Sequence, residues 1–483
     1  MAGRGVLAVA MVVAAAAAAA RPNVVVILAD DLGYGDVGAN GGTMIATPHI
    51  DALAARGVRL TQGYVSHPVC SPSRAGLITG RYQQRHGWEF NPAGRDRAAG
   101  MSTEEQTLAD VMRAAGYRTG LIGKWHLGSE PEHHPVNRGF DEFFGMVEGG
   151  SIYIDADVPG VESWGSPRIG RPNKIIRGLE EEVVVQEYLT DRFTDEAVDF
   201  IERHARSPFF LFLSHKTPHT PLQATAKYLD RYRHLDDDAA RVYAAMVASL
   251  DDSVGAVVAA LEREGLRDDS LIVFLSDNGC AGYVANACSN APLRGFKRHF
   301  HEGGIRVPFI VSWPNALPEG GVFRHMAVSL DLMDTFLAAA GRGEASDDSV
   351  DLKPYLDGTD LGAPHDYLYW RSGPNWAVRD QRWKLIRYNR TGFARQDLDR
   401  SGRLIPPDGG WPNDSPHGQV TLLYDLANDP SESINYAAGR PELVERLTKA
   451  WERWNGENAP EPILPAYRST LGETHGETVQ LVF

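Results

Sequence analysis

Four apolar runs in this chain each end in polar or charged residues, and this pattern constrains the fold more than any other feature of the sequence. The runs are continuous and rich in β-branched and aromatic residues, as expected of strands buried on both faces. The runs and their polar ends are "NVVVILA" with Asp30 and Asp31, "YRTGLIGKWH" with Lys124 and His126, "FFLFLSHKTPH" with His215 and His219, and "SLIVFLSDN" with Asp277 and Asn278. Each run predicts one strand.

Amphipathic helical segments lie between these runs. Their caps and apolar spacing predict helices over 48–56, from Ser102 to Gly116, over 191–204 and over 243–264. Strands that alternate with helices imply an α/β fold, with a large, mostly parallel sheet sandwiched by helices. Ligands bind such sheets at the carboxyl ends of the strands. We therefore expect the four polar ends to meet in one site.

The character of the sequence changes after about residue 345. The segments "HDYLYWRSG", "NWAVRDQRWKLIRY" and "VTLLYDL" are short and alternating, and "RPELVERLTKAWERWNGE" follows as an amphipathic helix. This pattern predicts an antiparallel sheet with a terminal helix. We predict a large α/β domain over residues 21–345 and a smaller C-terminal α+β subdomain over residues 346–483.

The N-terminus is typical of an export signal. Arg4 precedes an uncharged, apolar run from Gly5 to Ala20, which ends in small residues before Arg21. This arrangement predicts a cleaved signal peptide over residues 1–20, with a membrane anchor or an alanine-rich tail as the alternatives. We expect no membrane span in the mature chain, which would be exported to the periplasm or secreted.

The charge balance limits the classes of partner. The chain has 48 Lys and Arg residues against 63 Asp and Glu residues, a net charge of −15, and it has no basic tract. A nucleic-acid partner is therefore not expected. A polyanionic substrate would need a local basic pocket to overcome this background.

Three cysteines are present, and one of them has an unusual neighbourhood. Cys280 and Cys288 lie close together in "DNGCAGYVANACSN", where a disulfide and two free thiols are both open alternatives. Cys70 is left over. It lies in "HPVCSPSRAG" among small and basic residues, which suit neither a buried structural thiol nor a disulfide.

Several spaced motifs extend the context of Cys70. They are "VVVILADDLGYGD", "PVCSPSRAGLITGRYQQRHG", "GKWHLG", "FLSDNG" and "LRGFKRHFHEGGIRVP", with a weaker one, "LLYDLANDPSESIN", near the C-terminus. Over about residues 22–340 the chain resembles the formylglycine-dependent type I sulfatases, the arylsulfatase family of the alkaline-phosphatase superfamily. The resemblance implies an alkaline-phosphatase-like fold and a sulfuric ester hydrolase.

The resemblance also implies a role for Cys70. In that family a formylglycine-generating enzyme oxidises this cysteine to an aldehyde, and Pro72 and Arg74 belong to the signal that it reads. A hydrated aldehyde offers one hydroxyl to attack sulfur and expel the alcohol, and a second whose deprotonation releases sulfate. A serine would instead be left as a stable sulfate ester. A structural or unmodified Cys70 is the alternative.

The oxygen-rich strand ends suggest a metal site. Asp30, Asp31, Asp277 and Asn278 offer only oxygen ligands, which favour a hard cation such as Ca²⁺ or Mg²⁺. The resemblance implies one Ca²⁺ bound by these residues and by the modified Cys70. Taken singly, each motif is more typical of a turn or helix cap.

Basic residues and histidines complete the implied catalytic set. By resemblance, Arg74 and Lys124 stabilise the hydrated nucleophile, His126 deprotonates its second hydroxyl, His219 protonates the leaving oxygen, and Lys297 binds sulfate. Histidine is the side chain suited to proton transfer near neutral pH. Any one of these lysines alone would be read as a solvated surface residue.

One stretch departs from the family pattern. Arg298, His299 and His301 occupy positions where many relatives carry small or hydroxyl residues. We predict that Arg298 and His301 bind a carboxylate or second sulfate of the substrate, with His215 as a less certain contact whose alternative is a packing role.

The substrate class is predicted by analogy. A sulfated carbohydrate or polysaccharide fragment fits an exported enzyme. The alternatives are a phosphonate or phosphodiester hydrolase that uses the same aldehyde, and a non-catalytic binding protein. The complete set of six catalytic candidates argues against the last.

Overall fold

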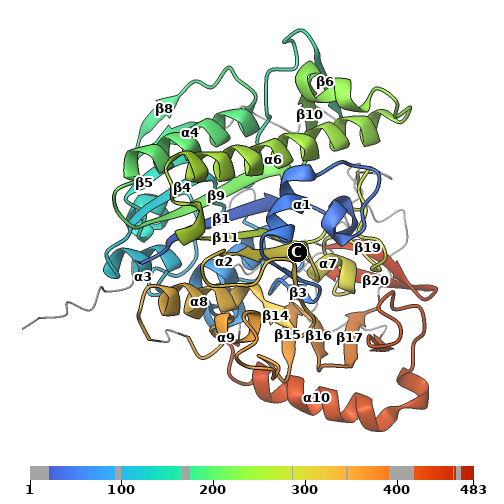
Figure 1. The fold of residues 1–483 in the computed structure, drawn as a ribbon. Helices are drawn as coiled ribbons and strands as arrows, with labels where there is room; N and C mark the ends of the chain where they lie inside the picture. Colours follow the sequence, from blue (N-terminus) through green and yellow to red (C-terminus); the bar gives the residue numbers. More distant parts are fainter. Residues whose placement is uncertain are drawn as a thin grey trace, which may run out of the picture.

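The computed structural model describes residues 21–92, 99–165, 174–284, 287–343, 346–390, 418–460, 462–463 and 469–482. A ten-stranded sheet runs through this part of the chain, in the order β13-β2-β12-β11-β1-β9-β4-β5-β7-β8 (Figure 1). Its strands are β1 (Asn23–Asp30), β2 (Val58–Leu60), β4 (Arg118–Lys124), β5 (Glu142–Met146), β7 (Ile175–Arg177), β8 (Glu181–Val183), β9 (Phe209–Pro218), β11 (Ser270–Ser276), β12 (Phe309–Ser312) and β13 (Gly321–Phe323). The four predicted strands β1, β4, β9 and β11 are confirmed.

The centre of the sheet is parallel. β1 pairs in parallel with both β11 and β9, and β4 pairs in parallel with β9 and β5. The register sets Ala29 of β1 beside Ser276 of β11, so the residues that follow these two strands emerge side by side. Every residue of β1 is buried, because helices cover both faces of the sheet.

Two helical layers cover the sheet, as Figure 1 shows. One layer contains α4 (Leu189–His204) and α6 (Asp238–Arg263), with α1 (Pro48–Ala55) and α5 (Ala226–Leu229). The other layer contains α2 (Cys70–Thr79), α3 (Leu108–Ala114), α8 (Leu332–Ala339) and α9 (Lys353–Leu356). Alternate residues of β1 join the two hydrophobic clusters under these layers, Val25 and Ile27 in one, Val24 and Val26 in the other. The predicted sandwich of helices around a mostly parallel sheet is confirmed.

Helix α6 is long and apolar enough to cross a membrane by length and composition, which the sequence analysis did not recognise. Within the fold, 72% of its most apolar window is buried. It packs on the central sheet and on α4, so its apolar character is explained by the protein core.

The start of α3 differs from the prediction. The helix begins at Leu108 rather than near Ser102, because Thr107 and Asp110 form the capping box. Thr107 Oγ1 accepts from the Asp110 backbone N–H at 3.1 Å, and Asp110 Oδ2 accepts from the Thr107 N–H at 3.1 Å. The Ser102–Glu105 spacing forms a turn instead. Two cap patterns of the same spacing followed one another in the sequence, and the second one starts the helix.

A second, antiparallel sheet follows in the C-terminal part of the chain, as predicted. It consists of β15 (Leu368–Ser372), β16 (Asn375–Arg379), β17 (Trp383–Asn389) and β18 (Gln419–Asp425). Helix α10 (Pro441–Asn455) packs on it through Trp451, whose ring stacks on that of Trp376 with centroids 4.3 Å apart. The other elements are α7 (Glu302–Ile305) and the two-stranded pairs β3 (Gly63–Tyr64) with β14 (Ala327–Val328), β6 (Val161–Trp164) with β10 (Leu222–Thr225), and β19 (Ser469–Thr474) with β20 (Glu477–Val482).

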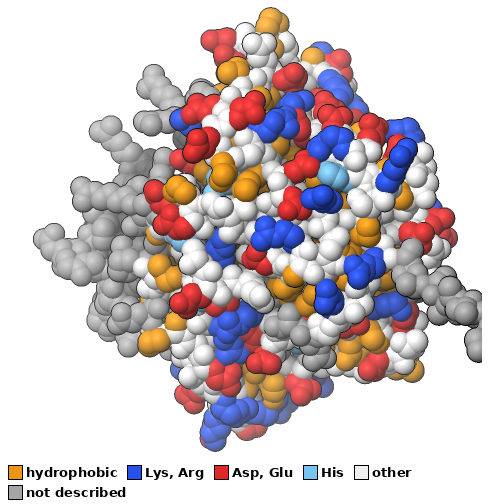
Figure 2. Space-filling view, turned by 90° about the vertical axis from the view of Figure 1, so that its left-hand side faces the viewer, with side chains coloured by type: hydrophobic (Ala, Val, Ile, Leu, Met, Phe, Trp, Pro, Cys, Tyr) orange, Lys and Arg blue, Asp and Glu red, His pale blue; other side chains and the backbone are white. Residues whose placement is uncertain are grey.

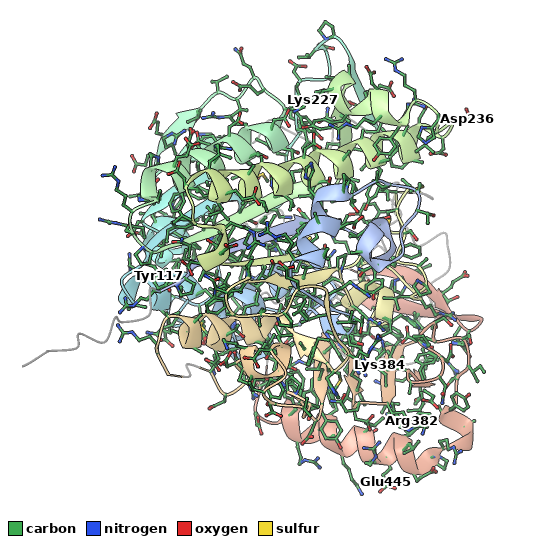
Figure 3. The ribbon with its side chains drawn as sticks, in the orientation of Figure 1. Tyr117, Lys227, Asp236, Arg382, Lys384 and Glu445 are labelled. Carbon is green, nitrogen blue, oxygen red and sulfur yellow. A yellow bond between two sulfur atoms is a disulfide. The ribbon has the colours of Figure 1, made fainter. Side chains whose placement is uncertain are left out.

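A buried ion network joins the second sheet to α7. Lys384 Nζ lies 2.9 Å from Glu302 Oε1 and 2.7 Å from Glu432 Oε1, and all three side chains are buried. Figure 3 shows Lys384 between the central sheet and α10. By contrast, the face in Figure 2 carries basic and acidic side chains interspersed with one another.

The predicted boundary at 345/346 touches residues outside the described ranges and stays a prediction, as does the signal peptide over 1–20.

Candidate active site

The polar strand ends meet around Cys70. Asp30 ends β1, Asp277 follows β11, and Cys70 is the first residue of α2. Cys70 Sγ lies 3.4 Å from Asp30 Oδ1 and 3.8 Å from Asp31 Oδ1. Cys70 lies at the N-terminus of α2, where the positive end of the helix dipole favours negative charge. The ends of separate strands therefore converge in the structure, as the sequence predicted.

Backbone strain marks two of these positions. Asp31 and His126 have φ of 67°, in the left-handed region that residues with a side chain rarely adopt. Such strain persists where the surroundings hold it, and it is concentrated at functional sites. Asp31 is held by its own N–H, which donates to Asp277 Oδ1 at 3.2 Å, and by Asn278 Nδ2, which donates to Asp31 Oδ1 at 2.6 Å.

Strand β4 approaches β9 very closely just before Lys124. A Cβ on Gly123 would lie 1.9 Å from Ser214 O, so only glycine fits at this position. This close approach brings the carbonyl of Lys124 to Ser214 Oγ, which donates to it at 2.6 Å. Glycine at position 123 thus allows the sheet to deliver the Lys124 side chain into the cluster.

Each of the three aspartates is paired with one buried cation. Lys124 Nζ lies 2.7 Å from Asp30 Oδ2, Lys297 Nζ lies 2.6 Å from Asp31 Oδ1, and Arg74 Nη2 lies 2.8 Å from Asp277 Oδ2. Buried charges are stable only when paired in this way. Lys297 Nζ also lies 3.0 Å from Cys70 Sγ, so the positive charge reaches the predicted nucleophile.

Burial raises the pKa of the carboxyl groups in the cluster, and pairing with cations lowers it. For Asp30, burial alone would raise the pKa, but Lys124, His219 and Arg74 outweigh it and hold the pKa well below its usual range. Burial and the charge of Asp30 raise the pKa of Asp277 to about 7. Burial also raises the pKa of the Cys70 thiol, so the unmodified side chain is held neutral.

The donor set fits a hard divalent cation. Asp30, Asp31, Cys70 and His219 each offer one ligand atom, and these atoms lie within 4.8 Å of one another. In the described part of the chain, the buried Asn278 Oδ1 has no hydrogen-bond partner. A buried amide oxygen without a donor, next to carboxylates, is what an oxygen-binding ion would satisfy.

Two histidines flank the cluster. His219 Nδ1 lies 2.7 Å from Thr220 O, which assigns the proton to Nδ1 and leaves Nε2 facing Asp31 Oδ2 at 3.7 Å. Burial lowers the pKa of His219 to about 4, although Asp30 and Asp31 oppose the shift. Burial, together with Lys124 and Arg74, lowers the pKa of His126 well below its usual value.

The structure does not bring His215 or His301 to this cluster. His215 faces the helical layer, where Nε2 lies 2.9 Å from Ser253 Oγ of α6. His301 Nε2 lies 3.2 Å from Tyr424 Oη and 3.2 Å from Thr474 Oγ1, under the C-terminal strands. Both are buried in these surroundings, away from the cluster, and a substrate contact of either residue stays a prediction.

Arg298 does lie near the cluster, and the structure adds Tyr283 beside it. The Arg298 guanidinium carbon lies 5.3 Å from the ring centroid of Tyr283, whose hydroxyl donates to Asp31 Oδ2 at 3.4 Å. The sequence analysis missed Tyr283. The available signal was its position six residues after Asp277, between Cys280 and Cys288, which form a disulfide in the structure.

A buried lysine, Lys216, was also missed. Its Nζ donates to the carbonyl oxygens of His219 at 3.2 Å and Thr220 at 3.0 Å, and it lies 3.8 Å from the ring centroid of Tyr153. These contacts fix the turn that carries His219. No local pattern distinguishes Lys216 from a solvated lysine.

Comparisons with known proteins find similarity to sulfatases over most of the chain. The Sulfatase family model matches residues 22–342, and the model described as N-sulphoglucosamine sulphohydrolase, C-terminal, matches residues 295–400. Arylsulfatase D of Homo sapiens is 31% identical over 500 residues, which cover 86% of this chain and 82% of the relative. N-acetylgalactosamine-6-sulfatase of Mus musculus is 31% identical, covering 89% of this chain and 84% of the relative.

Solved structures show the same likeness. The crystal structure of Ps i-CgsB in complex with k-i-k-neocarrahexaose is 32% identical, with a TM-score of 0.77, and covers 91% of this chain and 94% of that chain. The PsFucS1 sulfatase from Pseudoalteromonas sp. is 26% identical, with a TM-score of 0.73 and 90% coverage of each chain. The phosphonate monoester hydrolase of Agrobacterium radiobacter, at 21% identity and a TM-score of 0.63, shares the fold over 90% of this chain and 95% of that one.

Proposed function

The chain belongs to the sulfatase family and is a sulfuric ester hydrolase, and from this premise we propose that it removes sulfate from a sulfated carbohydrate, using formylglycine made from Cys70 and one Ca²⁺. The observation that carries the proposal is the position of Lys297 Nζ, 3.0 Å from Cys70 Sγ and 2.6 Å from Asp31 Oδ1. One cation thus contacts both the proposed nucleophile position and the proposed metal ligands.

Position 70 is suited to an attack on an anionic centre. The sulfur of a sulfate ester is surrounded by oxygens that carry negative charge, so attack on it needs nearby positive charge. Formylglycine, as its hydrate, supplies one hydroxyl for attack on sulfur and a second whose deprotonation releases sulfate. Lys124 and Arg74 lie behind position 70 and are held by Asp30 and Asp277. Because each cation is balanced by its aspartate, the excess positive charge that the attack needs would come from a bound divalent cation.

Asp30, Asp31, Asp277 and Asn278 would hold the Ca²⁺. The ion supplies a Lewis acid and an activator for the nucleophile. The unpartnered Asn278 Oδ1 supports this assignment, because a buried amide oxygen needs a positive partner. Lys297, beside Asp31, is placed to contact a sulfate oxygen.

The two histidines divide the proton transfers. His219 presents Nε2 toward the cluster while its Nδ1 donates to Thr220 O, so Nε2 of the neutral ring carries no proton. To protonate the leaving oxygen, the ring must first take up a second proton on Nε2, which the negative charge of a bound sulfate ester would favour. His126 Nδ1 is buried without a hydrogen-bond partner among the described residues. It is the candidate to accept the proton in sulfate release.

The relatives support a carbohydrate substrate. N-acetylgalactosamine-6-sulfatase is named for a sulfated amino sugar, and Ps i-CgsB was solved with a neocarrahexaose. The Cys280–Cys288 disulfide supports export, since structural disulfides persist in oxidising compartments. We therefore keep the periplasm or the extracellular space as the proposed location, and an aldehyde-forming enzyme as the partner in maturation.

The test is sulfate release from defined sulfated oligosaccharides by protein produced with a formylglycine-generating enzyme. We expect release with wild type and none with Cys70→Ala. Mass spectrometry of the peptide that contains position 70 should show the aldehyde. Full activity in a preparation with unmodified Cys70 would contradict the nucleophile, and a higher kcat/KM on phosphonate or phosphodiester substrates would contradict the proposed reaction.

A further inference from the structure

A short loop closed by the Cys280–Cys288 disulfide carries an exposed aromatic ring to the mouth of the site. The ring is that of Tyr283, which is 45% exposed, although its hydroxyl reaches Asp31 Oδ2 at 3.4 Å. An exposed aromatic side chain with its polar end inside a charged cluster is not explained by core packing. The proposed reaction steps leave this ring without a role.

The start of this loop, at Cys280, is held by two hydrogen bonds of its backbone. Cys280 N–H donates to Asn290 Oδ1 at 3.1 Å, and Cys280 O accepts from the Lys297 N–H at 2.9 Å. The disulfide closes the segment from Cys280 to Cys288. The position of Tyr283 is thus tied to the backbone of Lys297, the residue placed to contact sulfate.

Arg298 lies against the same ring from the next loop. Its guanidinium carbon lies 5.3 Å from the ring centroid of Tyr283, within cation–π range. Its backbone has φ of 79°, and its N–H donates to Pro68 O at 2.8 Å, two residues before Cys70. This hydrogen bond holds the strained backbone of Arg298 beside the segment that contains Cys70. The side chain is thereby directed to Tyr283 at the edge of the site and not to bulk solvent.

Phe296 is a second aromatic side chain next to the loop. It is 36% exposed, and a Cβ on Gly282 would lie 3.0 Å from its ring. Two exposed aromatic rings and one guanidinium group therefore lie beside the charged cluster around Cys70, and we call these three side chains the rim. Flat apolar faces of pyranose rings pack on exposed aromatic rings, and guanidinium groups bind carboxylate and sulfate groups in bidentate fashion.

We propose that Tyr283 and Arg298 form a subsite for an anionic pyranose ring of the substrate. Tyr283 packs against the face of the ring, and Arg298 binds a carboxylate or a second sulfate on it. The inference rests on the proposed carbohydrate substrate and specifies its chemistry. The disulfide restricts the loop that carries Tyr283, which reduces the conformational freedom lost on binding and favours affinity.

The test measures binding separately from catalysis. In a Cys70→Ala background, which does not turn over, calorimetry gives Kd for three oligosaccharides of equal length: one with a uronic acid next to the sulfated residue, one with a second sulfate, and one with a neutral neighbour. We expect Tyr283→Ala to raise Kd for all three by at least about tenfold, and Tyr283→Phe to stay within about threefold of the background.

Arg298→Ala should raise Kd by at least about tenfold only for an anionic neighbour, and the ligand that loses most identifies that anion. Tyr355→Ala and Arg324→Ala, remote from the cluster, serve as matched controls. In the active enzyme, Tyr283→Ala should lower the ratio of kcat/KM for the oligosaccharide to that for nitrophenyl sulfate.

Unchanged binding in Tyr283→Ala, or equal losses in Tyr283→Phe and Tyr283→Ala, would overturn the packing of Tyr283 against the sugar ring. Equal losses of Arg298→Ala on neutral and anionic ligands would overturn the anion contact. Failure of the proposed function is distinct, because it would appear as wild-type enzyme that releases no sulfate from any oligosaccharide.

Discussion

Lys216 donates through Nζ to the carbonyl oxygen of His219 at 3.2 Å, so a buried amino group fixes the turn that presents the proposed proton donor. The same Nζ donates to Thr220 O at 3.0 Å, and the carbonyl of His219 also accepts from the Tyr153 hydroxyl at 2.8 Å. The geometry assigns Lys216 a positioning role, which differs from contact with the substrate.

Replacement of Lys216 should therefore act through the leaving group. Lys216→Met leaves two buried carbonyls without this donor and loosens His219, so we expect kcat to fall by about ten- to a hundredfold with a smaller change in KM. An alkyl sulfate, whose leaving oxygen needs a proton, should lose more than nitrophenyl sulfate. Lys227→Met, on an exposed lysine labelled in Figure 3, is the control. Equal losses on both substrates would argue against a role through His219.

The buried pair of Lys124 and Asp30 should be needed for stability as well as activity. Lys124→Met removes the nearest cation from the buried carboxylate of Asp30 and leaves only the longer contact with Arg74 at 3.8 Å, so we expect a loss of about 3–5 kcal/mol in the free energy of unfolding. Urea unfolding measures this loss. The exposed pair of Lys449 and Glu445 provides the comparison, and Lys449→Met should change stability little. A Lys124→Met protein as stable as wild type would show that water or an ion compensates Asp30.

Metal removal should destabilise the protein and abolish sulfate release. We expect a chelator to lower Tm and added Ca²⁺ to restore it, because Ca²⁺ binds the folded cluster and not the unfolded chain. Asn278→Ala removes an amide oxygen and should raise the Ca²⁺ concentration at half-restoration by at least about tenfold. Asp252→Asn alters a second cluster of the described residues, formed by His49, Asp251 and Asp252, in which Asp251 already caps α1. This variant should leave the dependence of Tm on Ca²⁺ concentration unchanged. Identical curves for all three proteins would contradict the ligand assignment.

Loss of the disulfide should affect both stability and substrate binding. A loop of this short length contributes roughly 2–3 kcal/mol by restricting the unfolded chain. We expect the double variant Cys280→Ser, Cys288→Ser to lose about this much, and its KM for a sulfated oligosaccharide to rise because Tyr283 is no longer tethered. Denaturant titration and steady-state kinetics measure the two effects. Lower stability with an unchanged KM would show that the loop keeps its shape without the bond.

His365 should make one part of the stability depend on pH. Its Nε2 lies 2.9 Å from Asp331 Oδ1. Burial alone would lower the pKa of His365, but the charge and hydrogen bond of Asp331, with smaller effects of Asp348 and Asp366, raise it. The folded chain therefore binds this proton more tightly than the unfolded chain, and the stabilisation is complete below about pH 6.5 and lost as the pH rises through the folded pKa.

The variant His365→Gln tests this sign. The difference in unfolding free energy between wild type and variant should be about 1–2 kcal/mol larger at pH 5.5 than at pH 9. Urea titrations at both pH values measure it. A difference that grows toward high pH would contradict the proposed ion pair.

The sequence predicted the strands of the site well, because their signals are local. Asp30 and Asp277 each follow a long apolar run, and parallel strands with covered faces must end at the same edge of the sheet. The surroundings of His301 could not be predicted, because they come from Tyr388 and Tyr424, more than 80 residues away in the chain. Nothing in the sequence near His301 indicates that the second sheet covers it.

Tyr283 and Lys216 were missed for a related reason. Their roles depend on where a side chain points at the end of a strand, and periodicity does not report that direction. The start of α3 shows the same limit on a smaller scale, since two capping patterns competed and the hydrogen bonds of Thr107 decided between them. Local patterns located the elements, and long-range contacts decided the function of individual side chains.

Because Ala29 of β1 pairs with Ser276 of β11, the proposed metal ligands follow two adjacent buried strands. The proposed substrate-binding residues lie on separate loops, so chemistry and substrate preference can be engineered independently. The ligand set is attached to strands whose every residue is enclosed by core, so insertions there would disrupt the whole sheet. The rim residues sit on loops that leave the sheet at the same edge. Libraries that randomise the loops around Tyr283 and Arg298 should therefore alter substrate preference while the chemistry beneath them stays intact.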